Sequence, residues 1–376
     1  MASLQDIAAI NPKSDQLQNT FIYIDLEAVE KGELRKIQEI MREEAPSRAQ
    51  RVINNNDILF QCVRPYQKNN YIHKILNTSN QQWVASTGYA QIRTTESPNY
   101  IYHLLNTDGF NRKVMVRCTG SSYPAINSED LATIRFYYTP DKKEQFKISR
   151  LLDLIDERIA TQNKIIYKLK SLIRGIMVEL QKRGLSNGTW KKVLLSNVLT
   201  ERNELNKSLY PVYSVSVIQG IVNQMEYLGR SFAASDTSKY HVVHYGDLVY
   251  TKSPTGSFPY GIIKQSYNQN EVAVSPLYGV YEPKTFSTGV FLHEYFKSEL
   301  NTLNYLHPLV QKGAKNTINI ANQRFLESYV AIPSNANELL AISKLLCSLN
   351  TKLEFLQNIL KQSQGQKQYL LRQMFI

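Results

Sequence analysis

The sequence contains one long helical pattern twice, half a chain apart. Residues 148–172 read ISRLLDLIDERIATQNKIIYKLKSL, and residues 342–360 read ISKLLCSLNTKLEFLQNIL. Both segments open with Ile-Ser-basic-Leu-Leu and continue with apolar residues at alternating spacings of four and three. This spacing places the apolar side chains along one seam of a helix that packs against another helix. Any fold of this chain must therefore accommodate two long helices.

The apolar seam of each copy can be followed along the sequence. In the first copy, Gln162 is the single polar member of a series that runs from residue 148 to residue 180. In the second copy, the series weakens at Ser363 and Lys367 and recovers at Leu370. The positions that we predict to form the helix–helix seam are Ile148, Leu152, Ile155, Ile159, Ile166, Leu169, Ile173, Ile342, Leu346, Leu349, Leu353, Leu356 and Leu360.

The length of the first helix indicates what it packs against. A helix over residues 148–180 would be roughly 50 Å long at about 1.5 Å per residue. A globular domain of about 145 residues has a radius of gyration of only about 15 Å, so such a helix overruns its own domain. We therefore expect the two long helices to pack on each other as an antiparallel coiled coil that separates two globular parts.

Weaker repeats support a chain built from two copies of one unit. Asp57-Ile-Leu-Phe in the first half is matched by Asp247-Leu-Val-Tyr in the second, and Gly120 is matched by Gly313. The matches keep one order and a nearly constant offset, which favours an internal duplication. We predict globular parts at 1–145 and 185–335, and long helices at 146–184 and 336–376. The link QKRGLSNGTW (181–190) contains the glycines that we expect to end the first helix.

The globular parts have the pattern of mixed α and β structure. Short apolar runs bounded by Asn, Ser, Gly and Pro predict strands, and longer amphipathic runs predict helices. The expected strands are FIYIDL (21–26), DILFQCV (57–63), KVMVRCT (113–119), TIRFYYT (133–139), SVSVIQG (214–220), YHVVHYGDLVYT (240–251), YGIIKQS (260–266) and EVAVSPLYGVYE (271–282). The expected helices are NYIYHLLNT (99–107) and GVFLHEYFKSELNTLNYL (289–306). The predicted fold class is α+β, with two pseudo-symmetric mixed domains separated by the long helices.

Charge and cysteine content limit the partners and the compartment. The chain has 44 Lys and Arg against 32 Asp and Glu, a formal net charge of +12, which favours a polyanionic partner. Cys62, Cys118 and Cys347 are widely separated and odd in number, which disfavours a disulfide framework or a cysteine zinc site. There is no basic segment followed by a long apolar run at the start and no stretch of about 20 apolar residues. We predict a soluble protein of the reducing cytoplasm.

The motifs of common enzymes are missing. The sequence has no G-x-x-x-x-G-K-[ST] phosphate loop and no G-x-S-x-G turn. His293-Glu294 is not followed by a second His at the spacing that a zinc protease helix needs. We find no cluster of catalytic carboxylates and no glycine-rich cofactor turn after a strand. The sequence therefore predicts a chain without catalytic residues, metal or cofactor of its own.

The two-copy arrangement resembles the DNA-specificity subunit of type I restriction–modification systems, over essentially the whole chain. The family pattern Q-x-K-I-x-x-x-L-x-x-[LI]-D resembles QFKISRLLDLID at 145–156, and its tail K-x-x-L-L-x-x-M-F resembles KQYLLRQMF at 367–375. Its G-D-I-[LV]-[FV] strand resembles Asn56-Asp57-Ile-Leu-Phe and Gly246-Asp247-Leu-Val-Tyr. The second long helix departs from the pattern at Leu339 and Asn350.

The resemblance implies a division of labour between subunits. Two target recognition domains would each read one half of a bipartite site in double-stranded DNA, and the helices would set the gap between the halves. The helices would also dock two methyltransferase subunits, which supply S-adenosylmethionine and the catalytic residues, and a restriction or translocase subunit can join. Two alternatives remain open: a coiled-coil scaffold that binds no DNA, and a single-chain methyltransferase or nuclease.

Candidate DNA-contacting residues lie in loops where basic or amide side chains alternate with aromatic ones. Arg pairs well with guanine and Asn with adenine, and a Gly-Ser-Ser turn can offer backbone N–H groups to a phosphate. An ordinary solvated loop is the alternative for any one of these residues. The candidates of the first half are Arg64, Tyr66, Lys68, Arg117, Thr119, Ser121, Ser122 and Tyr123, with Arg93 as a weaker one. Those of the second half are Lys252, Ser253, Thr255, Tyr260, Lys312, Lys315 and Asn316.

The two halves should read different base sequences. The long helices repeat closely, whereas the loops TGSSYP (119–124) and KGAKNT (312–317) barely match, and similar base contacts would need similar side chains. Replacing residues 186–335 by the corresponding region of a relative should change one half of the recognised site, as mapped by sequencing of methylated DNA. A change in both halves would contradict this prediction.

Overall fold

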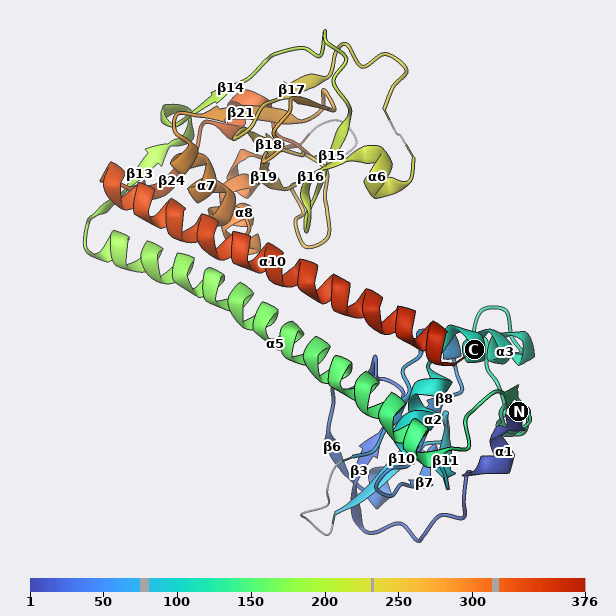
Figure 1. Ribbon diagram of the computed structural model, residues 1–376. Helices are drawn as coiled ribbons and strands as arrows, with labels where there is room; N and C mark the ends of the chain where they lie inside the picture. Colours follow the sequence, from blue (N-terminus) through green and yellow to red (C-terminus); the bar gives the residue numbers. More distant parts are fainter. Residues whose placement is uncertain (75–80, 231–232, 313–317, 376) are drawn as a thin grey trace. The chain divides into compact units, whose positions relative to one another are not determined.

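The structure is a computed structural model of the chain and describes residues 1–74, 81–230, 233–312 and 318–375 (Figure 1). The chain divides into two compact units. Unit 1 consists of residues 1–163 with 358–376, and unit 2 consists of residues 164–357. Both units mix helices and strands, which confirms the predicted secondary-structure content.

The elements of the first half precede and include the first long helix. Its strands are β1 (Ala2–Ser3), β2 (Ala8–Ile10), β3 (Thr20–Ile24), β4 (Val29–Glu30), β5 (Glu33–Leu34), β6 (Gln38–Met41), β7 (Ala49–Val52), β8 (Ile58–Gln61), β9 (Tyr71–Ile72), β10 (Gln82–Ser86), β11 (Tyr89–Thr94) and β12 (Arg135–Phe136). Its helices are α1 (Leu4–Ile7), α2 (Pro98–Leu105), α3 (Asp108–Arg117), α4 (Ser128–Ala132) and α5 (Lys142–Ser186), with 3₁₀ turns at Arg42–Glu44 and Pro65–Gln67.

The elements of the second half end with the second long helix. Its strands are β13 (Trp190–Leu194), β14 (Leu199–Glu201), β15 (Tyr213–Ser216), β16 (Gly220–Asn223), β17 (His241–Val243), β18 (Leu248–Tyr250), β19 (Ile263–Gln265), β20 (Val272–Val274), β21 (Gly279–Pro283), β22 (Gln311–Lys312), β23 (Ile318–Asn319) and β24 (Tyr329–Pro333). Its helices are α6 (Gln224–Leu228), α7 (Phe286–Tyr295), α8 (Glu299–Leu306), α9 (Asn322–Phe325) and α10 (Ala336–Met374), with 3₁₀ turns at Leu195–Asn197 and His307–Leu309.

One sheet order occurs in both units. Unit 1 has a four-stranded sheet in the order β2-β11-β8-β9, and unit 2 has one in the order β14-β21-β18-β19, with every neighbouring pair antiparallel. In each unit a helix follows the second strand of this order in the sequence: α2 follows β11, and α7 follows β21. Each of these helices buries its apolar residues with the sheet in a single core. The repeat seen in the sequence therefore corresponds to a repeated local topology.

Each of these sheets begins its β8 or β18 strand with a buried aspartate. Asp57 and Asp247 are each only 1 % exposed. Asp57 accepts the Asn54 backbone N–H at 2.7 Å, and Asp247 accepts the His244 N–H at 2.9 Å, so each carboxylate closes the turn that leads into its strand. A buried carboxylate also needs a cation. Arg93 and Arg202 supply it, each through two nitrogens.

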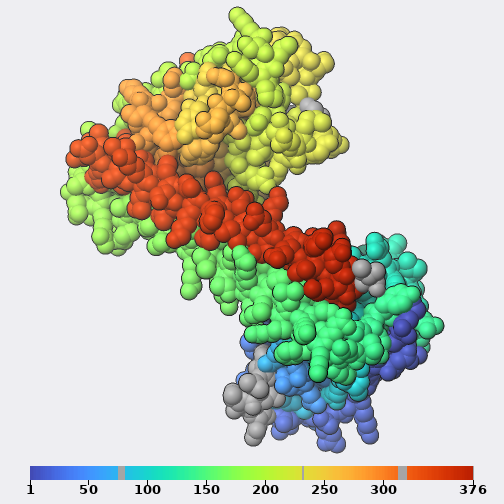
Figure 2. Space-filling view, in the orientation of Figure 1, coloured from blue at the N-terminus to red at the C-terminus, as the bar shows by residue number. Residues whose placement is uncertain are grey.

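The long helices cover each other's apolar residues inside each unit. In unit 1 the end of α10, in dark red, lies against the first part of α5, in green (Figure 2). Lys367 of α10 forms an ion pair with Asp156 of α5 at 2.6 Å, and Phe375 packs on the same core as Ile148. Because the later residue of one helix meets the earlier residue of the other, the two segments run antiparallel in this unit. In unit 2, Leu169 and Ile173 share one core with Ile342, Leu346, Leu349 and Leu353. Every predicted seam position is buried or half-buried.

One expected strand is a helix in the structure. Residues 113–119 were expected to form a strand, but residues 113–117 belong to α3. Thr107 caps that helix by accepting the Phe110 N–H, and Phe110 and Val114 lie one helical turn apart on its buried face, which outweighs the β-propensity of the two valines. The first long helix passes through Gly184 and ends at Ser186, and Gly188 of the predicted link follows it with a φ of +67°. The ring of Trp190 packs where a Cβ of residue 184 would lie, so this glycine allows close packing.

Unit 2 buries a charged cluster between β19, α7 and α10. The Glu294 side chain is 2 % exposed and accepts hydrogen bonds from Lys297, just beyond the end of α7, and from Asn350 of α10, the latter at 2.8 Å. Lys264 on β19 is 5 % exposed. Burial, aided by the charge of Lys297 and opposed by Glu294, lowers the pKa of Lys264 from 10.5 to about 8.

Replacing Lys264 with Met should stabilise unit 2 near pH 7 and lose this advantage in alkali. Because the folded-state pKa is lowered, the unfolded chain binds more protons between pH 8 and pH 10.5, so the wild-type protein gains stability as pH rises through that window. A shift of this size corresponds to a free energy on the order of 3 kcal/mol. The melting-temperature difference between K264M and wild type should therefore shrink from pH 7 to pH 9.5. A difference independent of pH would refute the explanation.

Candidate nucleic-acid interface

Two of the predicted DNA-contacting loops of unit 1 lie side by side. Val63 and Ala125 form an isolated β-bridge, and the Arg64 N–H donates to the Pro124 carbonyl at 2.8 Å. The Ile126 N–H donates to the Cys62 carbonyl at 3.0 Å. The segment that leaves β8 and the segment that follows α3 are thereby joined along their backbones. Residues from both are available to one surface.

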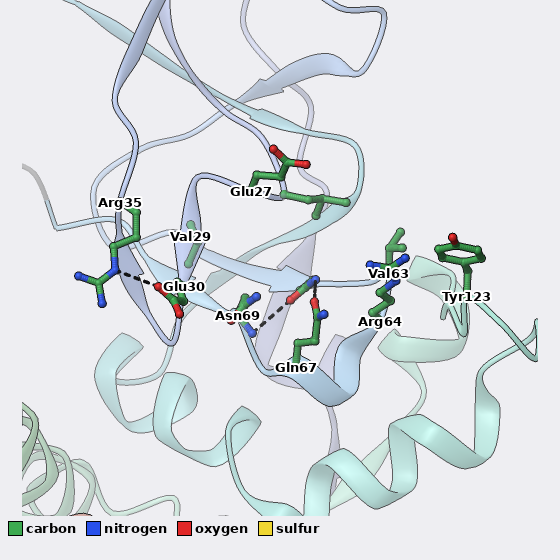
Figure 3. A pocket seen from close by; sticks show the side chains of 11 residues that line it. Glu27, Val29, Glu30, Arg35, Val63, Arg64, Gln67, Asn69 and Tyr123 are labelled. Carbon is green, nitrogen blue, oxygen red and sulfur yellow. Dashed lines mark hydrogen bonds and ion pairs between the residues drawn. The ribbon is translucent and has the colours of Figure 1, made fainter. Parts of the chain in front are cut away.

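A cavity of about 600 Å³ opens beside this junction (Figure 3). Arg64 and Tyr123 lie at one side of it, Glu30 and Arg35 lie at the other, and Glu27 lies between them. Its remaining lining residues are Leu26, Val29, Gln61, Val63, Gln67 and Asn69. Three of the side-chain amides are already engaged. Gln61 Nε2 donates to Gln67 Oε1 at 3.1 Å, Gln61 Oε1 accepts the Asn69 backbone N–H at 3.2 Å, and Asn69 Oδ1 accepts the Lys31 N–H at 3.0 Å. The cavity is thus a polar site with charges on opposite sides.

Arg64 and Lys68 have unusual backbone conformations at the two ends of the 3₁₀ turn. Their φ angles are +55° and +53°, in the left-handed region that residues other than glycine seldom adopt. Such strain is often found at ligand-binding positions. The Arg64 guanidinium carbon lies 4.4 Å from the centroid of the Tyr123 ring, in cation–π geometry. Lys68 instead donates to Asp108 at 2.6 Å and to the Asn106 carbonyl at 3.1 Å.

The other candidates of unit 1 differ in their availability. Tyr66 and Tyr123 are 50 % and 63 % exposed. Ser121 and Ser122 are exposed on the 119–124 turn, and Thr119 is bonded through its backbone to Ala125. Arg117 donates to the Asp130 carbonyl and to Thr133 Oγ1 at 2.8 and 2.7 Å.

Arg93 is held by Asp57 in a two-nitrogen pairing with both distances at 2.8 Å. Its fork is therefore occupied by a carboxylate and can read a base only if Asp57 releases it.

The structure does not assemble an equivalent site in unit 2 from the described residues. Lys252 is half-buried, and burial lowers its pKa. Thr255 Oγ1 donates to the Ser253 carbonyl at 3.0 Å, and the Tyr260 carbonyl accepts the Tyr250 hydroxyl at 2.7 Å, so this loop is packed on the unit. The backbone of Lys312 lies in β22. Lys315 and Asn316 lie outside the described residues.

The residues on the far side of the cavity, on the β4–β5 hairpin, were not among the site residues predicted from the sequence. Glu30 and Glu33 flank the two-residue turn of the β4–β5 hairpin, at Lys31 and Gly32, where φ is +51° and +83°. Two positive φ values define the type I′ turn that matches strand twist, and Lys-Gly between short apolar-polar pairs is a recognisable, if weak, hairpin signal. The hairpin carries two of the cavity's acidic and basic lining residues, Glu30 and Arg35 at its edge.

Within the described ranges, no three His, Cys, Asp or Glu side chains gather in an arrangement that could hold a metal ion. Over the same residues, no helix is long and apolar enough to cross a membrane. Cys62, Cys118 and Cys347 are free thiols, and burial raises the pKa of Cys62 to about 11.

Comparisons with known proteins identify the fold. No protein-family model matches the sequence, and no curated protein matches it. The type I restriction–modification S subunit from M. genitalium is similar over 100 % of this chain and 95 % of its own, with a TM-score of 0.63 at 13 % identity. A chain from a structure on complex assembly and conformational transition of the type I R-M system is similar over 100 % and 96 %, with a TM-score of 0.54 at 17 % identity. The HsdS subunit from Thermoanaerobacter tengcongensis is aligned over the whole chain at a TM-score of 0.41 and adds nothing further.

These likenesses show that the chain has the fold of a type I specificity subunit, from its first element to its last. The resemblance drawn from the sequence is therefore confirmed at the level of the fold.

The assignment of Arg93 to the polar core of unit 1 can be tested by stability. Arg93→Met leaves the Asp57 carboxylate buried, with only N–H partners such as Asn54 and Gln91 Nε2. Loss of one partner from a buried pair is strongly destabilising, and since Arg93 itself is 40 % exposed we expect a loss of about 2 kcal/mol. Thermal unfolding should show this loss, and Arg93→Lys should recover part of it. An unchanged melting temperature together with weakened DNA binding would assign Arg93 to the DNA instead.

Proposed function

We propose that this chain is the sequence-specific DNA-binding specificity subunit of a type I restriction–modification complex. In this proposal each unit reads one half of a bipartite site in double-stranded DNA. The observation that carries the proposal is the likeness of the whole chain to solved S subunits of type I systems. The formal net charge of +12 and the exposed aromatic and basic side chains of the unit 1 loops support it.

The proposal includes a pseudo-symmetric division of the chain. Recognition domains at 1–145 and 185–335 would alternate with spacer helices at 146–184 and 336–376, and the helices would form an antiparallel coiled coil that fixes the gap between half-sites. The repeated sheet order and the burial of the seam positions within each unit support this division.

The long helices would also dock two methyltransferase subunits. Several large apolar side chains point away from the seam and are exposed: Leu151 and Leu154 in unit 1, and Ile165, Leu172 and Phe355 in unit 2. Exposed apolar residues at helical spacing fit a helix or groove of a partner protein. These partners would supply S-adenosylmethionine and the catalytic groups, and a restriction or translocase subunit would join the complex in the cytoplasm. The isolated chain would have no catalytic activity.

The salt dependence of DNA binding tests the proposal against a scaffold that binds no DNA. A chain that contacts about four or more phosphates should lose affinity for duplex DNA roughly a hundredfold between 50 and 200 mM salt, because binding releases counterions. Fluorescence anisotropy with a labelled duplex measures this slope. No binding at low salt, alone or with the methyltransferase partner, would leave the scaffold as the better reading. Methyl transfer by the purified chain alone would favour the single-chain enzyme.

A heptad insertion tests the spacer role. Seven residues inserted after Thr161 and after Phe355 keep the apolar seam in phase and add roughly 10 Å to each helix. This length corresponds to about 3 base pairs at roughly 3.4 Å per pair. The complex should then methylate the same two half-sequences separated by a longer gap, as mapped by sequencing. An unchanged gap with full activity would show that the helices dock partners without setting the spacing.

A further inference from the structure

We propose that Arg64, held against Tyr123 at the edge of the unit 1 cavity, reads a guanine in the half-site that unit 1 recognises. This inference rests on the proposed function. The proposed function does not specify which residue reads which base, and the inference assigns one residue to one base. It starts from a difference among the arginines of the chain. Most of those near the candidate loops already have polar partners, and Arg64 does not.

The donors of Arg64 are free. In the described part of the chain, no carboxylate or carbonyl accepts a hydrogen bond or ion pair from its guanidinium, whose one recorded contact is the Tyr123 ring at 4.4 Å. Arg35 pairs with Glu33 at 2.7 Å, Arg93 with Asp57 and Arg117 with a carbonyl and a hydroxyl. A half-buried guanidinium without partners has donors to offer to a ligand.

The position of Arg64 is fixed before any ligand arrives. Its N–H donates to the Pro124 carbonyl at 2.8 Å, and its carbonyl accepts the Gln67 N–H at 3.0 Å. The left-handed backbone is a strained conformation that the surrounding loops must sustain. The Tyr123 ring, from the other loop, gives the planar guanidinium a face to rest on. A fork held in one plane loses less entropy when it binds a planar partner.

The charges around the cavity favour a base edge over a phosphate. Glu27 and Glu30 line the same cavity. Glu30 lies 3.4 Å from Arg35, whereas Glu27 forms no ion pair within the described residues. The unpaired Glu27 carboxylate would repel a phosphate beside it, whereas the edge of a base pair is neutral. Guanine offers two acceptors, N7 and O6, that match the arginine fork, while adenine presents a donor in place of O6. The cytosine of the same pair presents an N4–H₂ donor, which a carboxylate such as Glu27 can accept.

The test compares the methylation patterns of variants in a host that lacks the native modification. The chain is expressed with its methyltransferase partner, and methylated sites are mapped by sequencing. The wild-type complex should show a bipartite motif with a fixed guanine in one half. Arg64→Ala should accept other bases at that position and methylate the original site roughly 5- to 150-fold more slowly. The other half of the motif should not change.

Matched variants separate base reading from other roles. Arg48→Ala removes an exposed arginine of the same unit that does not line the cavity, and should leave the motif intact. Tyr123→Leu changes an exposed ring, so it should fold, and it should weaken the preference for guanine while keeping its position. If Arg64→Ala proves unstable, the Tyr123→Leu variant still tests whether this site reads a guanine.

Two results would overturn the inference while the proposed function stands. If Arg64→Ala slows methylation of all sites equally and keeps every base fixed, Arg64 contacts a phosphate. If the motif and the rate are both unchanged, it contacts no DNA. A wild-type complex that methylates no sequence-specific site would instead overturn the proposed function and this inference with it.

Discussion

Unit 1 is incomplete until the last turns of α10 are in place. Phe375 packs its ring 5.1 Å from that of Tyr100, Arg372 reaches Asp108 at 3.7 Å, and Lys367 pairs with Asp156 at 2.6 Å. The core that holds the sheet and α2 of this unit therefore includes residues from both ends of the chain. The polar break in the α10 seam has a physical reason, because the Lys367 ion pair fits only one direction and one register of the two helices. The chain must bring its distant segments together before the first unit can close.

The buried aspartates show how two units can repeat a structure while their sequences diverge. Asp57 is paired by Arg93 from β11, the neighbouring strand, whereas Asp247 is paired by Arg202, which follows β14 one strand further away. The β21 residue next to Asp247 in the sheet is Glu282, and Arg202 also contacts it at 3.2 Å. The requirement for a cation at the buried carboxylate is met in both units, although a different strand supplies it. Because the two arginines come from different strands, an alignment of the two halves of the sequence does not pair them.

The parts of the fold that were predictable are those governed by periodicity. The seams of α5 and α10 and strands such as β3, β8 and β18 follow from apolar runs and spacing, which depend on the sequence alone, whereas β10 and β11 were not predicted. The α3 segment did not follow, because alternating valines at 114 and 116 resemble a strand until Phe110 and the Thr107 cap are considered with them. The cavity could not be predicted from the sequence for a different reason. Arg64 and Tyr123 were identified singly, but their contact and the position of Glu27 at the same cavity depend on loops that meet only in the folded unit.

The positive charge of the chain does not by itself locate a site for DNA, because pairing decides which cations are available. Lys68, Arg93 and Arg117 are bound to groups of the protein, and Arg64 is not. Arg64 lies just beyond β8, whose side chains Ile58 and Phe60 belong to the core, while Tyr123 is exposed on a loop whose Ile126 belongs to the core. The Arg64 and Tyr123 side chains can therefore change without altering the packing of the sheet. In such an arrangement, a new recognition sequence requires new loop residues and no new fold.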